Sequence, residues 1–198
     1  MGHLQSNQVE ADTKIILHAL DATTDGVTEL HIHSQDTDVL VLAIRRYPEL
    51  CVNTSFVTRE GSRRVIDLKS IVEALGPSKT AALPAFHALS GADNTGSFWG
   101  KGKLTCWKAF EKADEAVADA LENLERAALP DDEIIASIET FVCELYLPKT
   151  SITTVKELRW FLFRKKQAQS DRLPSTQAAL YQASYERITK WWCGIVTR

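Results

Sequence analysis

The sequence predicts an α/β fold whose second half is entirely helical. Segments with the alternation of strands occur among helical patterns up to about residue 92, whereas only helical patterns follow from residue 104. With 198 residues, of which 44% are hydrophobic, the chain is long enough to bury a core without disulfides or structural metals. Its 4 cysteines are scattered, with no metal-ligand spacing, which predicts a reducing, intracellular setting such as the nucleus.

The first elements alternate between helix and strand. Asn7 followed by Glu10 resembles a capping box and predicts a helix that ends near residue 24. The alternation over residues 28–34 predicts a strand. The apolar run 39–44 fits either a strand or a buried helix. Residues 50–58 and 63–68 flank a Glu-Gly pair and predict a β-hairpin.

Helices are expected over the rest of the chain. Gly76 is expected to end a helix over 67–76, and Gly91 to end another. Because proline is tolerated only in the first turn of a helix, Pro84 predicts that the second of these begins at about Leu83. Thr154 forms a capping-box pattern with Glu157. The later helices are predicted at about 104–125, 131–146, 154–168 and 175–193.

Charge is distributed unevenly although the net charge is only −3. Residues 111–133 hold nine acids against two bases, a net of −7, and residues 155–172 hold six bases against two acids, a net of +4. Two solvated helix faces account for this pattern. Alternatively, only the basic segment lies near a nucleic-acid backbone. The aromatic residues Trp160, Phe161 and Phe163 in that segment are expected in the core rather than at a base-stacking surface.

Five acidic residues in three clusters point to a metal site. They are Glu10 and Asp12, Asp36 and Asp38, and Asp93. Carboxylates gathered from distant segments are how a fold builds a site for hard divalent cations such as Mg²⁺. The last cluster continues into Gly100-Lys101-Gly102, a turn whose backbone can approach a phosphate, with Lys103 adding charge. Helix capping by Glu10 and Asp36, and a turn role for Asp93, are the alternatives.

The segment Ser90–Lys103, SGADNTGSFWGKGK, resembles the helix–two-turn–helix element of the flap endonuclease/XPG family of structure-specific nucleases in the PIN-like superfamily. In that element Gly-x-Asp is followed seven residues after the Asp by Gly-x-Gly, as Asp93 is by Gly100, and Ser97 matches a serine four residues after the Asp. The paired acids match, in the same order, an acidic pair at a helix start and an Asp-x-Asp after a strand. The segment also resembles the GCDTTSAFFGKGK-like segment of certain animal proteins.

The resemblance implies a PIN-like fold and phosphodiester hydrolysis with two Mg²⁺ or Mn²⁺ ions. Catalysis is then expected from Asp36, Asp38 and Asp93, with Glu10 and Asp12 completing the metal ligands. Ser97 and the turn from Gly100 to Lys103 are expected to bind nucleic acid, with a K⁺ ion bridging turn and phosphate. The implied partner is duplex or branched DNA.

The resemblance also sets the expected domains and one departure. A nuclease core is expected over residues 7–125, with the helix–two-turn–helix at 83–110, followed by a helical extension over 126–198. Only nine residues precede Glu10, so the family's first strand and early catalytic Asp have no counterpart. We therefore expect a PIN-like fold truncated at its N-terminus, from a longer protein, a fragmentary gene product or a degenerate relative. A catalytically inactive nucleic-acid-binding or protein-interaction module, and a purely structural domain, are the alternatives to a nuclease.

Overall fold

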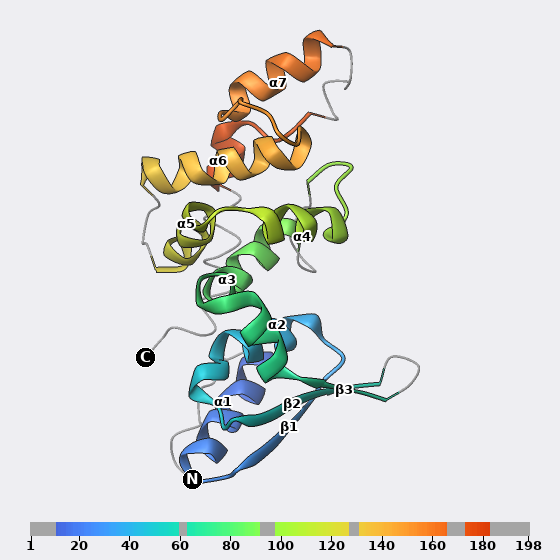
Figure 1. The fold of residues 1–198 in the computed structure, drawn as a ribbon, viewed down its shortest axis with the longest axis vertical. Coiled ribbons are helices and arrows are strands. Elements are labelled where there is room, and N and C mark those ends of the chain that lie inside the picture. Colours follow the sequence, from blue (N-terminus) through green and yellow to red (C-terminus); the bar gives the residue numbers. More distant parts are fainter. Residues whose placement is uncertain (1–10, 60–62, 92–97, 127–130, 166–172, 183–198) are drawn as a thin grey trace. The chain divides into compact units, whose positions relative to one another are not determined.

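The structure, a computed structural model, describes residues 11–59, 63–91, 98–126, 131–165 and 173–182 (Figure 1). The chain divides within α3 (Leu68–Gly91) into two compact units, one up to Pro84 and the other from Ala85. The predicted α/β class is confirmed, with a small three-stranded mixed sheet and mostly helices. The PIN-like identity and the division at residue 125 stay predictions. None of the helices in the described ranges is long and apolar enough to cross a membrane.

The first unit is built around a sheet with the strand order β1-β2-β3. Strand β1 (Glu29–His33) pairs in parallel with β2 (Asn53–Thr58), which pairs antiparallel with β3 (Arg64–Asp67). Both the strand predicted at 28–34 and the hairpin are confirmed; the tip of the hairpin lies outside the described residues. The inward side chains Ile32 and Phe56 are register partners and are both buried, so the sheet carries one core-facing apolar surface.

The ambiguous run 39–44 is helical. It forms most of α2 (Thr37–Arg46), and η1 (Tyr47–Glu49) follows it. Parallel strands need a crossover connection, usually a helix, and α2 supplies the one that joins β1 to β2. A helix starting at residue 11 in the structure, α1 (Ala11–Thr24), precedes β1 as predicted.

Gly76 interrupts α3 as predicted, because its backbone (φ 74, ψ 170) leaves the helical region. The predicted helix start at Leu83 is wrong: helical backbone continues directly from Pro77, with Pro84 in the interior. Pro77 occupies the first turn, where a missing N–H costs nothing, and so takes the role assigned to Pro84. Gly91 ends the helix with a left-handed φ of 107, which confirms the second stop.

All of the regular secondary structure described in the second unit is helical. The predicted helix at 104–125 is two helices, because Ala113 is extended (ψ 146) and the Asp114 carboxylate accepts a hydrogen bond from Val117 N, which starts a new helix. The helices predicted at 131–146 and 154–168 are confirmed where residues are described. Of the helix predicted at 175–193, residues 177–182 are described, and they are helical. The helices are α4 (Lys103–Lys112), α5 (Glu115–Arg126), α6 (Asp132–Tyr146) and α7 (Val155–Arg164).

Aromatic side chains form the centre of this unit. Phe86 stacks on Phe110, with ring centroids 4.3 Å apart, and meets Phe141 edge to face at 6.4 Å. Farther along α6, Cys143 packs with Leu158 and Leu162 of α7. Helix α6 therefore packs against both α4 and α7. The core of the unit comes from four segments that are distant in the sequence: the end of α3, α4, α6 and α7.

Candidate functional site

Asp36 and Asp38 stand where β1 ends and α2 begins. The Asp36 carboxylate accepts a hydrogen bond from Asp38 N at 2.8 Å and is thus the N-cap of α2. Its own N–H donates to Ser34 Oγ at 3.0 Å. The capping alternative for Asp36 is therefore confirmed. A cap uses one carboxylate oxygen and leaves the second able to bind a cation.

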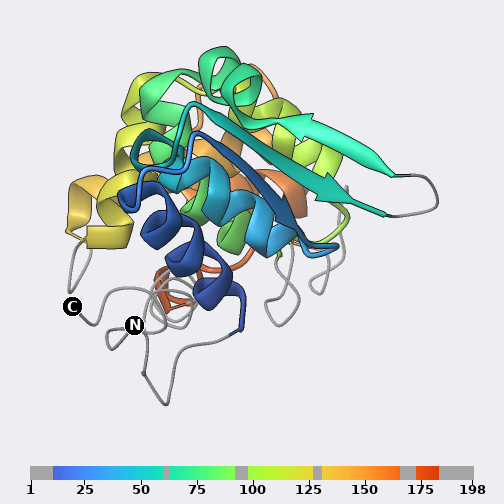
Figure 2. The same ribbon diagram turned by 90° about the horizontal axis from the view of Figure 1, so that it is seen from below.

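Asp12 lies in the first turn of α1 and is half-buried. The four residues 25–28 turn the chain back between α1 and β1, with Gly26 in the left-handed region at φ 88. Helix α1 therefore runs opposite to β1, as does the crossover helix α2, and both helices begin near the carboxyl end of β1 (Figure 2). In this way Asp12 comes to the same end of the first unit as Asp36 and Asp38.

These three carboxylates do not by themselves make a metal site. Within the ranges that the structure describes, no group of three or more His, Cys, Asp or Glu side chains could hold a metal ion. Glu10 and Asp93, the other members of the predicted ligand set, lie outside those ranges. The donor chemistry still fits a hard divalent ion, since Asp12, Asp36 and Asp38 offer only carboxylate oxygens.

The second candidate region is the 98–103 turn, which contains the predicted phosphate-binding turn Gly100-Lys101-Gly102 and Lys103. Phe98 is buried, and its carbonyl accepts a hydrogen bond from Lys101 N at 3.0 Å, which closes a tight turn. Gly100 has a φ of 69, a conformation that glycine adopts without strain. Trp99, which lies within this turn, is 50% exposed. Ser97, the remaining predicted contact, lies outside the described residues.

Gly102 provides no side chain to cap the start of α4. It is the N-cap residue of α4, and among the residues that the structure describes no side chain caps the helix there. Its φ of −72 suits any residue, and a Cβ at this position would meet nothing within 4 Å. Backbone geometry therefore does not demand glycine here. Glycine supplies no side chain to cap the N–H groups of Lys103 and Leu104, the kind of groups that bind anions at a helix start, whereas Thr105 N already donates to Gly102 O at 2.9 Å.

Tyr146 at the end of α6 fixes this turn. Its hydroxyl donates a hydrogen bond to Trp99 O at 3.2 Å, and its ring meets Phe98 edge to face at 6.4 Å. The Lys101 ammonium lies 5.0 Å from the centre of the same ring. Burial, with a smaller contribution from Cys106, raises the pKa of Tyr146 to about 12, so the phenol remains a donor at physiological pH. The sequence offered no signal for Tyr146, which lies 47 residues from Trp99.

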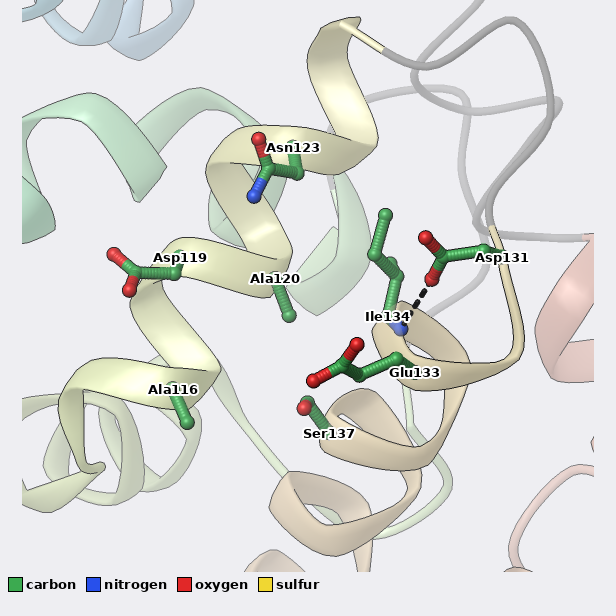
Figure 3. Close-up of a pocket in the computed structure, with 8 residues that line it drawn as sticks. All are labelled: Ala116, Asp119, Ala120, Asn123, Asp131, Glu133, Ile134 and Ser137. Carbon is green, nitrogen blue, oxygen red and sulfur yellow. Dashed lines mark hydrogen bonds between the residues drawn. The ribbon is translucent and has the colours of Figure 1, made fainter.

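A pocket of about 560 Å³ lies between α5 and α6 (Figure 3). Its lining includes the carboxylates of Asp119, Asp131 and Glu133. Asp131 is occupied as the N-cap of α6, where it accepts a hydrogen bond from Ile134 N at 2.8 Å. Carboxylates repel phosphate, so the charge of this pocket is unfavourable for a polyanion.

No family model matches the chain, and no match is found among curated proteins or solved structures. The resemblance to the flap endonuclease family therefore stays a prediction that depends on the motif residues.

Proposed function

We propose that this chain binds the sugar–phosphate backbone of structured nucleic acid, duplex or branched DNA, through the 98–103 turn. The observation that carries the proposal is the start of α4 at Gly102, where the N-cap residue has no side chain, next to Lys101 and Lys103. A helix N-terminus combines free N–H donors with a partial positive charge, and lysines add salt-dependent attraction to phosphate. Such contacts hold a duplex in position without selecting its sequence. A K⁺ ion between turn and phosphate, with Ser97 as a ligand, belongs to the same proposal.

Replacing Lys103 with alanine is expected to weaken duplex binding. It is also expected to reduce, by about 0.9, the steepness with which the logarithm of the binding constant falls with the logarithm of the salt concentration, which corresponds to the loss of one phosphate contact. Lys101→Ala is expected to act in the same direction. Fluorescence anisotropy with a labelled duplex at several salt concentrations measures both quantities. Lys108→Ala is the matched control, since it removes the same charge from an exposed position of the same helix. Equal effects of Lys103→Ala and Lys108→Ala would show that net charge, and not the turn, governs binding.

Gly102 allows a sharper control in the same assay. Asp and Asn are both good N-cap residues, and the backbone at Gly102 is already extended, so either substitution should cap α4 without disturbing the fold. Gly102→Asp also brings a negative charge to the place proposed for phosphate. We expect Gly102→Asp to bind much more weakly than Gly102→Asn, while thermal unfolding shows that both variants are at least as stable as the parent chain.

Divalent-metal-dependent hydrolysis of phosphodiesters is the second function that we infer. It is supported by the common end of β1, α1 and α2, to which Asp12, Asp36 and Asp38 belong (Figure 2). Two bound Mg²⁺ or Mn²⁺ ions, about 3.5–4 Å apart, would supply an activated water and stabilise the leaving oxygen. Of the described residues, Asp36 and Asp38 would hold them, with Asp12 as a further ligand.

Asp36→Asn is expected to reduce Mn²⁺-dependent cleavage of flap DNA by at least the roughly ten- to hundredfold that loss of a supporting ligand costs. Asparagine still caps a helix, so α2 keeps its start while the charge is lost. Asp67→Asn is the matched control: Asp67 accepts hydrogen bonds from Lys69 N and Ser70 N at the start of α3, outside the proposed metal ligands. Gel assays with and without EDTA measure cleavage. If the parent chain binds duplex DNA but cleaves nothing, the result would favour the alternative of a catalytically inactive binding module.

A further inference from the structure

Two aromatic rings on α7 are exposed where the sequence pattern predicted core. Trp160 is 62% and Phe163 57% exposed. Helix α7 packs on α6 with its other side, through Leu158 and Leu162. The core expectation for Trp160 and Phe163 is therefore wrong, because Val155, Leu158 and Leu162, at helical spacing, already supply the buried face of this short helix.

Basic side chains lie along the same exposed face. Lys156, Trp160, Phe163 and Arg164 are spaced i, i+4, i+7 and i+8, so they share one side of the helix. We call these four residues the α7 stripe. The guanidinium of Arg164 lies 5.9 Å from the centre of the Trp160 ring. The remaining basic residue of the helix, Arg159, donates to Pro174 O and so serves packing within the unit.

A flat apolar ring between cations suits a ligand with flat apolar faces and regular negative charge. Single-stranded nucleic acid has both, because its unpaired bases stack on aromatic rings while lysine and arginine contact its phosphates. A bilayer suits it less: interfacial helices bury a broad apolar face, and the aliphatic face of α7 is already used against α6. Duplex DNA suits it less as well, since its bases are stacked on one another and offer no face to a ring.

We propose that the α7 stripe binds single-stranded nucleic acid, with one base on Trp160 and the next on Phe163. Residues at i and i+3 of a helix stand about 5–6 Å apart, which separates two unstacked neighbouring bases. Lys156 and Arg164, at the two ends of the stripe, contact the phosphates on either side. The inference rests on the proposed nucleic-acid function and assigns the unpaired part of a branched substrate to α7, distinct from the duplex part at the 98–103 turn.

Trp160→Ala in the full chain should weaken binding of a labelled oligothymidylate roughly 5- to 150-fold, the range for loss of one base–aromatic stack. Binding of a duplex of equal length should stay unchanged. Trp160→Phe keeps a flat ring and should recover most of the affinity. Replacing Lys156 and Arg164 with alanine should lower the salt slope for the single strand by about 0.7 per lost phosphate contact. Val52→Ala, an exposed apolar position of the first unit, is the control and should change nothing.

The two proposals fail in different ways. If Lys103→Ala leaves duplex binding intact while Trp160→Ala abolishes single-strand binding, the turn proposal fails and the stripe stands. If Trp160→Ala binds oligothymidylate as the parent does, the stripe proposal is overturned. It is also overturned if Trp160→Ala abolishes binding to phosphatidylserine vesicles, or self-association in sedimentation, while single-strand binding is unaffected.

Discussion

Replacing Phe110 with alanine is expected to lower the free energy of unfolding of the second unit by about 3–5 kcal/mol, the cost of removing a large ring from a packed core. Phe110 is fully buried. Its ring stacks on Phe86 at an interplanar angle of 14° and meets Trp107 at 5.9 Å. Such aromatic pairs contribute about 0.5–1.5 kcal/mol beyond the area that they bury. Since whole domains are stable by only about 5–15 kcal/mol, this single change removes a large share.

Urea unfolding followed by near-ultraviolet circular dichroism measures this loss, because the signal comes from packed aromatic rings. Phe163→Ala is the matched control: it makes the same chemical change at a ring that is 57% exposed, where substitutions usually alter stability by less than about 0.5 kcal/mol. Equal losses in the two variants would mean that the stacked rings of Phe86 and Phe110 do not form the core of the unit. The stripe proposal requires the opposite ranking for single-strand binding, with Phe163→Ala the more damaging change.

Elements with local determinants could be predicted from the sequence. Asp36 caps α2 through an N–H only two residues away, and Gly76 breaks α3 through its own backbone angles. The predicted helix boundaries are wrong where the same local rule can be satisfied at more than one residue. Pro84 was assigned to a first turn that Pro77 occupies, and the break at Ala113 lies within an otherwise continuous helical pattern.

The candidate site depends more on distant contacts and was predicted less completely. The turn through Gly100, Lys101 and Gly102 could be predicted because two glycines at this spacing are typical of a turn; its role in phosphate binding stays a prediction. Tyr146, which holds that turn, could not, because its partner Trp99 comes from a segment far away in the sequence. The exposure of Trp160 was missed for a related reason: which face of α7 is buried depends on α6, and not on the hydrophobicity of the residues in α7 alone.

Replacing Glu139 with alanine is expected to lower the free energy of unfolding by about 2–4 kcal/mol, the range for losing hydrogen bonds to a charged group and leaving a buried donor unpaired. Glu139 lies on the apolar face of α6 and is only 4% exposed. One carboxylate oxygen accepts a hydrogen bond from Val155 N at 3.0 Å, and the other from Gln177 Nε2 at 3.0 Å. Val155 is the first residue of α7, where a helix has no internal acceptor for its N–H. Glu139 therefore completes the cap that Thr154 begins at Glu157 N.

Two further variants separate these contacts. Glu139→Gln keeps an oxygen for Val155 N, and the amide of Gln177 can rotate to accept from the new amide, so we expect a loss of about 1 kcal/mol. Gln177→Ala removes only the second contact and should cost about 0.5–1.5 kcal/mol. Urea titration gives the stabilities, and hydrogen exchange at Val155 N reports the cap directly, with faster exchange expected only in Glu139→Ala. If Glu139→Ala costs no more than Gln177→Ala, the carboxylate does not hold the start of α7. The position of Trp160 and Phe163 would then depend on the aliphatic contacts with α6 alone.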